Sequence, residues 1–292
     1  MPKRAPYTWR QPDFPGDGSD LSWQDPTLLV ICQKANVQAA IQPLLRSLKQ
    51  PFAPAQVASI FVHETMRDSF CDQVRSSMEP MHRQAASHAH YQQAIEMVDC
   101  LKAEVVSLLT PDDIRFRYKM STASPVIVCE FDQSFFGGSR PTSVVTLHTF
   151  RHASELPRLL AKERLPFASA AVWGPKMAAV YEAALHLDLP VVYINCQGLS
   201  LAPIQEFLAE QQPHVVLARY HHFEVILHGG KHRAIVYPAE VIWEPETLES
   251  PEPPIRPSAG AQGQPPAEGE LIQKLNQPHP KSLAKLTVLQ LR

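Results

Sequence analysis

Short apolar runs alternate with stretches of helical periodicity over most of the chain. The run from Thr27 to Ile31 is continuously apolar over the length of one strand, which is typical of a strand buried on both faces. Between Asn36 and Leu48 apolar residues recur at the spacing of one helix face, and Pro51 and Pro54 follow that segment. Helices alternating with short apolar strands predict an α/β domain whose sheet is at least partly parallel.

The same periodicities predict the other elements. Strands are expected over 59–63, 125–131, 143–150, 170–173, 191–195, 215–219, 223–227 and 234–237. Helices are expected over 65–78, 153–160, 176–187 and 204–211, with one or two more within 85–110. Gly229 and Gly230 should turn the chain between the last two strands. The predicted core contains Leu28, Leu29, Val30, Phe61, Val62, Val126, Ile127, Val128, Val172, Val191, Val192 and Ile194.

Three regions are expected along the chain. Residues 1–18 are rich in Pro, Gly and Asp and should be extended, and residues 19–244 should form one α/β domain. Residues 245–292 begin with nine prolines between Pro245 and Pro280, so this tail is predicted to be disordered because it cannot bury enough apolar surface. Its last part, 282–292, regains apolar residues. This short segment either buries itself against a partner or is a loose end.

Composition excludes several classes of protein. The 292 residues are 45% hydrophobic and 19% charged, which is enough for one sizeable core. A net charge of -2 without a basic stripe argues against nucleic acid as a partner, and no apolar run is long enough to span a membrane. The first ten residues lack the apolar region of a secretory signal. Five unevenly spaced cysteines without a C-x-x-C pair are typical of a reducing compartment, so a cytoplasmic protein is expected.

Two stretches of the sequence carry a resemblance to a known family. The first is D-L-S-W-Q-D-P at 20–26 with the following strand, and then F-V-H-E at 61–64. The second runs from F-A-S-A-A-V-W-G at 167–174 to P-V-V-Y-I-N at 190–195. Together they resemble the catalytic domain of aldehyde dehydrogenases, over roughly residues 20–196. The resemblance implies a three-layer domain with a mostly parallel sheet, on a scaffold that forms oligomers.

The catalytic positions implied by this resemblance are degenerate. The nucleophilic cysteine falls on Pro54 when residues are counted from Pro26 to Val62, or on Ala58 when Gln56 is taken as the glutamine of the family's G-Q-x-C motif. Neither side chain has a lone pair that could attack a carbonyl. The general-base glutamate falls on Asp20, which is still a carboxylate but one methylene shorter.

The cofactor positions are degenerate as well. The family's E-E-x-F-G-P motif, whose second acid holds the nicotinamide ribose, falls on Gln133 and Ser134, and only Phe136 and Gly137 match. Nineteen residues precede Asp20, whereas a dinucleotide-binding domain needs several βαβ units of about thirty residues each. No G-x-G-x-x-G sequence is present. We therefore expect neither a dinucleotide nor another cofactor.

Other reactive residues have simpler explanations. Cys32, at the end of its strand, is expected to be a small buried hydrophobe. Eight of the thirteen histidines form two clusters outside any zinc signature, so exposed or interface positions are expected and no metal site; they are 82, 88 and 90, and 214, 221, 222, 228 and 232. Asp112 and Asp113 should form a turn or helix cap, and the Asn195 amide should bond to loop backbone groups.

Two classes of function remain open at this point. One is a catalytically inactive aldehyde-dehydrogenase-like protein that acts through protein–protein interaction, self-association included. The alternative is an oxidoreductase or other enzyme with a rebuilt active site, which could use Cys32, Cys71, Cys196 or the histidines, or with a cofactor domain supplied by a partner.

Overall fold

A computed structural model describes residues 22–108, 124–138 and 140–239. The chain divides into two compact units, Met1–Pro245 and Glu246–Arg292, and all described residues belong to the first. The extended segment 1–18, the Pro-rich tail 245–292 and the turn at Asp112 and Asp113 lie outside the described residues. Their predicted structures therefore stay predictions.

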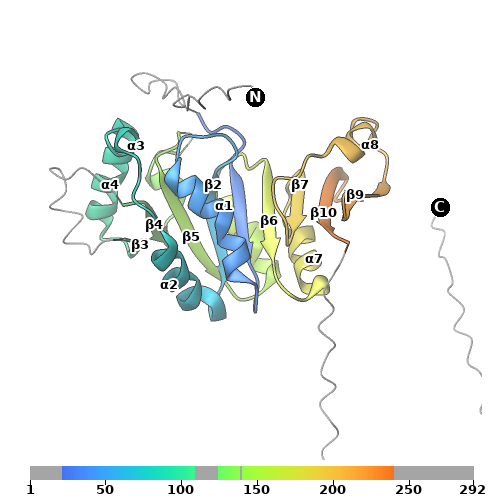
Figure 1. The fold of residues 1–292 in the computed structure, drawn as a ribbon, viewed down its shortest axis with the longest axis horizontal. Coiled ribbons are helices and arrows are strands. Elements are labelled where there is room, and N and C mark those ends of the chain that lie inside the picture. The colour runs from blue at the N-terminus through green and yellow to red at the C-terminus, as the bar shows by residue number, and fades with distance from the viewer. Residues whose placement is uncertain (1–21, 109–123, 139, 240–292) are drawn as a thin grey trace, which may run out of the picture. The chain divides into compact units, whose positions relative to one another are not determined.

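A single sheet organises the first unit (Figure 1). Its ten strands have the order β3-β4-β5-β2-β1-β6-β7-β10-β9-β8. Seven of them, from β4 to β10 in this order, run parallel to one another. β3 pairs antiparallel with β4 at one edge, and β9 and β8 continue the sheet with antiparallel pairs at the other. The strands are β1 (Thr27–Ile31), β2 (Val57–His63), β3 (Val105–Ser107), β4 (Val126–Cys129), β5 (Val144–Phe150), β6 (Ser169–Trp173), β7 (Val191–Ile194), β8 (His214–Ala218), β9 (His221–His228) and β10 (Lys231–Pro238).

Helices cover both faces of the sheet, which gives the predicted three layers. Helices α1 (Val37–Lys49) and α2 (Arg67–Ser77) pack on one face, the near face in Figure 1. Helices α6 (Leu156–Glu163) and α7 (Met177–His186) pack on the other. Successive strand residues point to opposite faces, so β1 sends Leu29 and Ile31 into the first core and Leu28 and Val30 into the second. The predicted fold class, an α/β domain with a mostly parallel sheet, is confirmed.

The described part of the unit has three further helices. They are α3 (Arg83–Ala86), α4 (Ala89–Leu101) and α8 (Gln205–Ala209), with single 3₁₀ turns at Glu64–Met66, Gln133–Phe135, Ala153–Glu155 and Ala202–Ile204. Gly229 and Gly230 both have positive φ, 59° and 77°, and they form the predicted turn between β9 and β10. In the described part of the chain no helix is both long and apolar enough to cross a membrane.

The sequence analysis missed one strand and misplaced one core residue. The helices expected within 85–110 are present as α4 and the end of α3, but the strand β3 that follows them was not predicted, because its three residues are too few to show a periodicity. Val191 was expected in the core and is only half-buried, because it begins its strand at the edge of the layer. The other predicted core residues are all buried.

Candidate functional site

The loops that carry the family-matched positions meet at the amino ends of β1, β2 and β5. The indole Nε1 of Trp23 donates a hydrogen bond of 3.0 Å to the carbonyl of Gly138, and the Ala55 amide donates one of 2.9 Å to the carbonyl of Gln24. These bonds bring the loop before β1 to the loops before β2 and β5. Asp20 itself lies outside the described residues.

The two candidate nucleophile positions differ in their surroundings. Pro54 is exposed in the loop before β2. Ala58 is fully buried in β2, at a bulge where the register with β1 slips by one residue. The Gln133 side-chain amide donates to the carbonyls of Ala58 (2.8 Å) and Val144 (2.9 Å). Gln133, at the first acidic position of the family motif, therefore ties β2 to β5.

The two cofactor positions also have structural partners. Ser134 is exposed, and both its hydroxyl and its backbone amide donate to the Asp132 carboxylate, the amide at 3.1 Å. Phe136 is 6% exposed and packs among Val126, Val128 and Val144. Both contacts stabilise the loop before β5.

Beneath this end of the sheet a carboxylate is buried. Glu163, the last residue of α6, is 1% exposed. It accepts hydrogen bonds from the Gln133 backbone amide (2.9 Å), the Thr146 hydroxyl (2.5 Å) and His148 Nε2 (2.8 Å). Ser59 on β2 extends the network, since its Oγ lies 2.9 Å from Thr146 Oγ1. The network joins α6, β5, β2 and the loop before β5.

His148 lies between two carboxylates. Its Nε2 bonds to Glu163, and its Nδ1 lies 3.7 Å from Glu130, which is half-exposed. Burial acts to lower the pKa of His148, but the Glu130 carboxylate near Nδ1 and the hydrogen-bonded, charged Glu163 outweigh burial, so this pKa is raised. The pKa of Glu130 is lowered although burial opposes it, because the nearby His148 ring and the two hydrogen bonds donated by Thr149 favour the charged carboxylate. Since His148 is fully buried, these charges serve the fold rather than contact with a substrate.

Three cysteines are buried and a fourth, Cys196, is partly buried, and burial makes their thiols poor nucleophiles. Burial raises the pKa to about 12 for Cys32, Cys129 and Cys196, and raises that of Cys71 despite the opposing charges of Arg67 and Arg75. A thiol with such a pKa stays protonated at neutral pH and is a poor nucleophile. Cys32 is 8% exposed, as the sequence predicted.

The two clusters of histidines found in the sequence lie in different parts of the fold. At the amino end, His88 packs on Phe52 with ring centroids 4.5 Å apart, and His90 Nδ1 lies 3.3 Å from the carbonyl of Pro141. Burial and the neighbouring His90 lower the pKa of His88. Near β8, His222 stacks on Tyr237. Over the described ranges, no group of three His, Cys, Asp or Glu side chains is placed to hold a metal ion.

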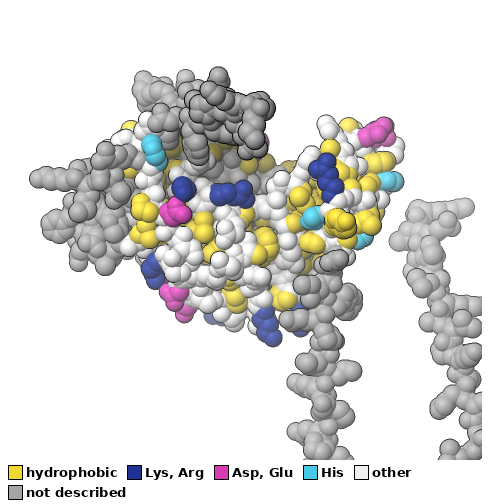
Figure 2. Space-filling model, in the orientation of Figure 1, with side chains coloured by type: hydrophobic (Ala, Val, Ile, Leu, Met, Phe, Trp, Pro, Cys, Tyr) yellow, Lys and Arg dark blue, Asp and Glu magenta, His cyan; other side chains and the backbone are white. Residues whose placement is uncertain are grey.

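The last strand of the sheet exposes apolar side chains. On β8, Val215 is 58% and Leu217 64% exposed, while Val216 and Ala218 pack inward against the first core. Figure 2 shows hydrophobic and histidine side chains side by side at the end of the molecule built by β8, β9 and β10. Tyr220, in the turn after β8, is 83% exposed. The outer edge of β8 pairs with no strand of the described chain.

Comparison with known families gives one match. The sequence model of the family described as "Protein of unknown function (DUF1487)" matches residues 22–243, which is most of the chain. The chain belongs to the DUF1487 family. No curated protein matches it.

Several solved structures are similar to the DUF1487 chain at low identity. They include an oxidoreductase from Marinobacter aquaeolei (17% identity, 62% of this chain and 40% of that one, TM-score 0.44). Succinate-semialdehyde dehydrogenase from Burkholderia pseudomallei has 17% identity over 62% of this chain and 40% of its own, with a TM-score of 0.45. Lactaldehyde dehydrogenase from Escherichia coli has 11% identity over 61% and 40%, with a TM-score of 0.44. The chain thus spans about 40% of these structures, and no activity follows from likeness at this level.

Two features of this DUF1487 chain were not predicted from its sequence: the burial of Glu163 and the exposure of β8. Glu163 lies just beyond the helix predicted over 153–160, and nothing in its neighbours signals burial. The exposure of Val215 and Leu217 was hidden in a continuous apolar run that is typical of a buried strand. Nothing within that run signals exposure, which follows from the place of β8 at the edge of the sheet.

Proposed function

We propose that this DUF1487 chain is a catalytically inactive aldehyde-dehydrogenase-like protein that acts by binding another protein molecule. The observation that carries the proposal is the open edge of β8 with its two exposed apolar side chains, Val215 and Leu217. An unpaired strand edge offers backbone donors and acceptors to an incoming strand, and neighbouring apolar side chains add affinity.

The composition of this edge supports the proposal. Edge strands are usually protected by charged side chains, proline or shortness. β8 reads His-Val-Val-Leu-Ala, with neither a charged residue nor a proline. The opposite edge of the sheet, β3, has only three residues, and two of them are buried. This difference between the two edges favours β8 as the edge that binds another strand.

The surroundings of the matched catalytic positions support inactivity. Pro54 and Ala58 carry no nucleophilic atom, and Ala58 is fully buried. The buried thiols of Cys32 and Cys196, with pKa values of about 12, offer no substitute at neutral pH. The five free cysteines fit a reducing compartment, and we place the protein in the cytoplasm on that ground.

An affinity-capture experiment with two matched variants tests the proposal. Leu217→Lys places a charge at the β8 edge, whereas Leu227→Lys changes a leucine of similar exposure, 57%, one strand further in and on the opposite face. Tagged chain should recover its binding partners, an untagged copy of itself among those assayed, with the wild type and Leu227→Lys but not with Leu217→Lys. Equal recovery by all three proteins would reject the β8 edge as the binding surface.

The alternative is an oxidoreductase or other enzyme with a rebuilt site or a borrowed cofactor domain. The observation that favours it is the presence of His88 and His90 at the same end of the sheet as Pro54 and Phe136, with His88 held neutral by its lowered pKa. A neutral imidazole can act as a general base. Turnover of an aldehyde by the full chain, abolished by His88→Ala, would favour this alternative over binding.

A further inference from the structure

We propose that a second copy of this chain occupies the β8 edge, so that two β8 strands pair antiparallel about a two-fold axis at Val216. This inference rests on the proposed function and names the partner for the same surface. It follows from the sequence and exposure of five residues, His214–Ala218.

The side-chain order of β8 is self-complementary in that register. An antiparallel pair centred on Val216 places Val215 of one copy opposite Leu217 of the other, and the reverse. Both side chains point away from the core face that Val216 and Ala218 occupy. Pairing therefore gathers four exposed apolar side chains into one patch on one face, as an isologous interface requires.

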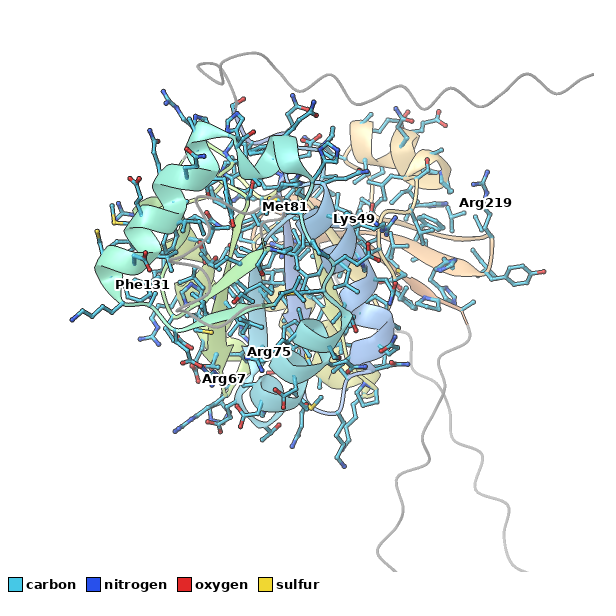
Figure 3. All side chains as sticks on the ribbon, turned by 60° about the vertical axis from the view of Figure 1, so that its left-hand side comes forward. Lys49, Arg67, Arg75, Met81, Phe131 and Arg219 are labelled. Carbon is cyan, nitrogen blue, oxygen red and sulfur yellow. The ribbon has the colours of Figure 1, made fainter. Side chains whose placement is uncertain are left out.

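The charges that flank β8 fit the same arrangement. Arg219 follows the strand, Glu210 lies four residues before it, and both are exposed. Figure 3 shows Arg219 projecting from the end of the sheet, on the other side of the molecule from Phe131. In the antiparallel pair Arg219 of one copy comes to the end of the strand where Glu210 of the second copy lies. Arg219 then faces Pro213 of the second copy, three residues after Glu210, so the pairing brings chain segments of opposite charge together at both ends of the strands.

A second copy also suits this edge better than the chain's own terminal segment. A segment as short as 283–291 is too short for a strand that is stable by itself, so docking it as a strand would cost conformational entropy. Two β8 strands are already formed on their sheets, each held by β9 over five residue pairs. Their association needs no ordering of the backbone, and this lowers its cost.

Sedimentation equilibrium of the full chain over a range of concentrations tests the inference. The wild type should reach twice the chain mass of 32.7 kDa and fall to 32.7 kDa on dilution. Leu217→Lys should weaken the dimer by about tenfold or more, because it puts a lysine into the apolar patch of each copy. Leu227→Lys and a chain that lacks residues 282–292 should dimerise as the wild type does. Circular dichroism should show the same fold for every variant.

A charge swap tests the register. Arg219→Glu should weaken the dimer, and adding Glu210→Lys to the same chain should restore it. If the double variant stays weak, the antiparallel register is wrong.

The other outcomes separate the inference from the proposed function. A wild type that stays monomeric, a Leu217→Lys dimer as strong as the wild type, or a dimer lost with residues 282–292 would overturn the second copy as occupant. In each case affinity capture of other proteins, sensitive to Leu217→Lys and not to Leu227→Lys, would leave the proposed function standing.

Discussion

Removing the Glu163 carboxylate should be among the most damaging single changes in this fold. Glu163→Ala leaves three buried donors without their acceptor: the Gln133 amide, the Thr146 hydroxyl and His148 Nε2. Each unsatisfied donor costs about 1–3 kcal/mol, and breaking a buried ion pair by removing one partner costs about 3–5 kcal/mol in total. We expect the free energy of unfolding to fall by roughly 3–5 kcal/mol, a large part of the 5–15 kcal/mol typical of a domain.

Urea unfolding followed by circular dichroism measures this change. The slope of the free energy of unfolding against urea should stay the same while the midpoint falls. Glu163→Gln keeps an acceptor oxygen and should cost less than Glu163→Ala. The matched control is Glu182→Ala, whose exposed carboxylate lies 4.0 Å from His186, and it should cost less than about 0.5 kcal/mol. If Glu163→Ala costs no more than this control, the buried network does not hold the sheet to α6.

Three further predictions follow from the described residues. The pKa of His148 is raised above its ordinary value of 6.5. The stability that this histidine contributes is therefore fully present below pH 6.5 and is lost as the pH rises through the folded-state pKa. The urea midpoint of the wild type should fall as the pH rises through this window, and that of Glu163→Gln should change less. Iodoacetamide at neutral pH should label the exposed Cys100 first and Cys129 only after unfolding, because Cys129 is 2% exposed with a pKa of about 12; early labelling of Cys129, read by peptide mass spectrometry, would contradict the fold around β4. Calorimetric titration should detect no nicotinamide dinucleotide binding, and an aldehyde panel should give no change at the nicotinamide absorbance; micromolar binding or clear turnover would reject the assignment of inactivity.

Local patterns were enough to predict most of the sheet. A continuous apolar run such as 27–31 has few alternatives to a buried strand, and the glycine pair at 229–230 has few alternatives to a tight turn. Asn195 was expected to bond to loop backbone groups, and its amide does so: Oδ1 accepts from the Gly174 amide at 2.9 Å, and Nδ2 donates to the Gly174 carbonyl at 2.8 Å. These features could be predicted because each depends on residues that are close together in the sequence.

Features that depend on distant residues could not be predicted in this way. Glu163 is buried only because Gln133, Thr146 and His148 reach it from the loop before β5 and from β5 itself. Neither the meeting of the loops at Trp23, Ala55 and Gly138 nor the structural role of Gln133 was predicted from the sequence. β8 is exposed because it lies at the edge of the sheet. The order of strands in a sheet cannot be predicted from the periodicity of a single strand, so this exposure could not be predicted.

Site-specific photo-cross-linking tests the central claim most directly. A photoreactive amino acid placed at Leu217, and in a matched chain at Leu227, samples two leucines of similar exposure on neighbouring strands. Irradiation of the full-length protein in cell extract should give a discrete protein adduct from position 217, a second copy or another protein, and none from position 227. No discrete adduct at 217, or the same adducts from both positions, would contradict the claim that this chain acts by binding through β8.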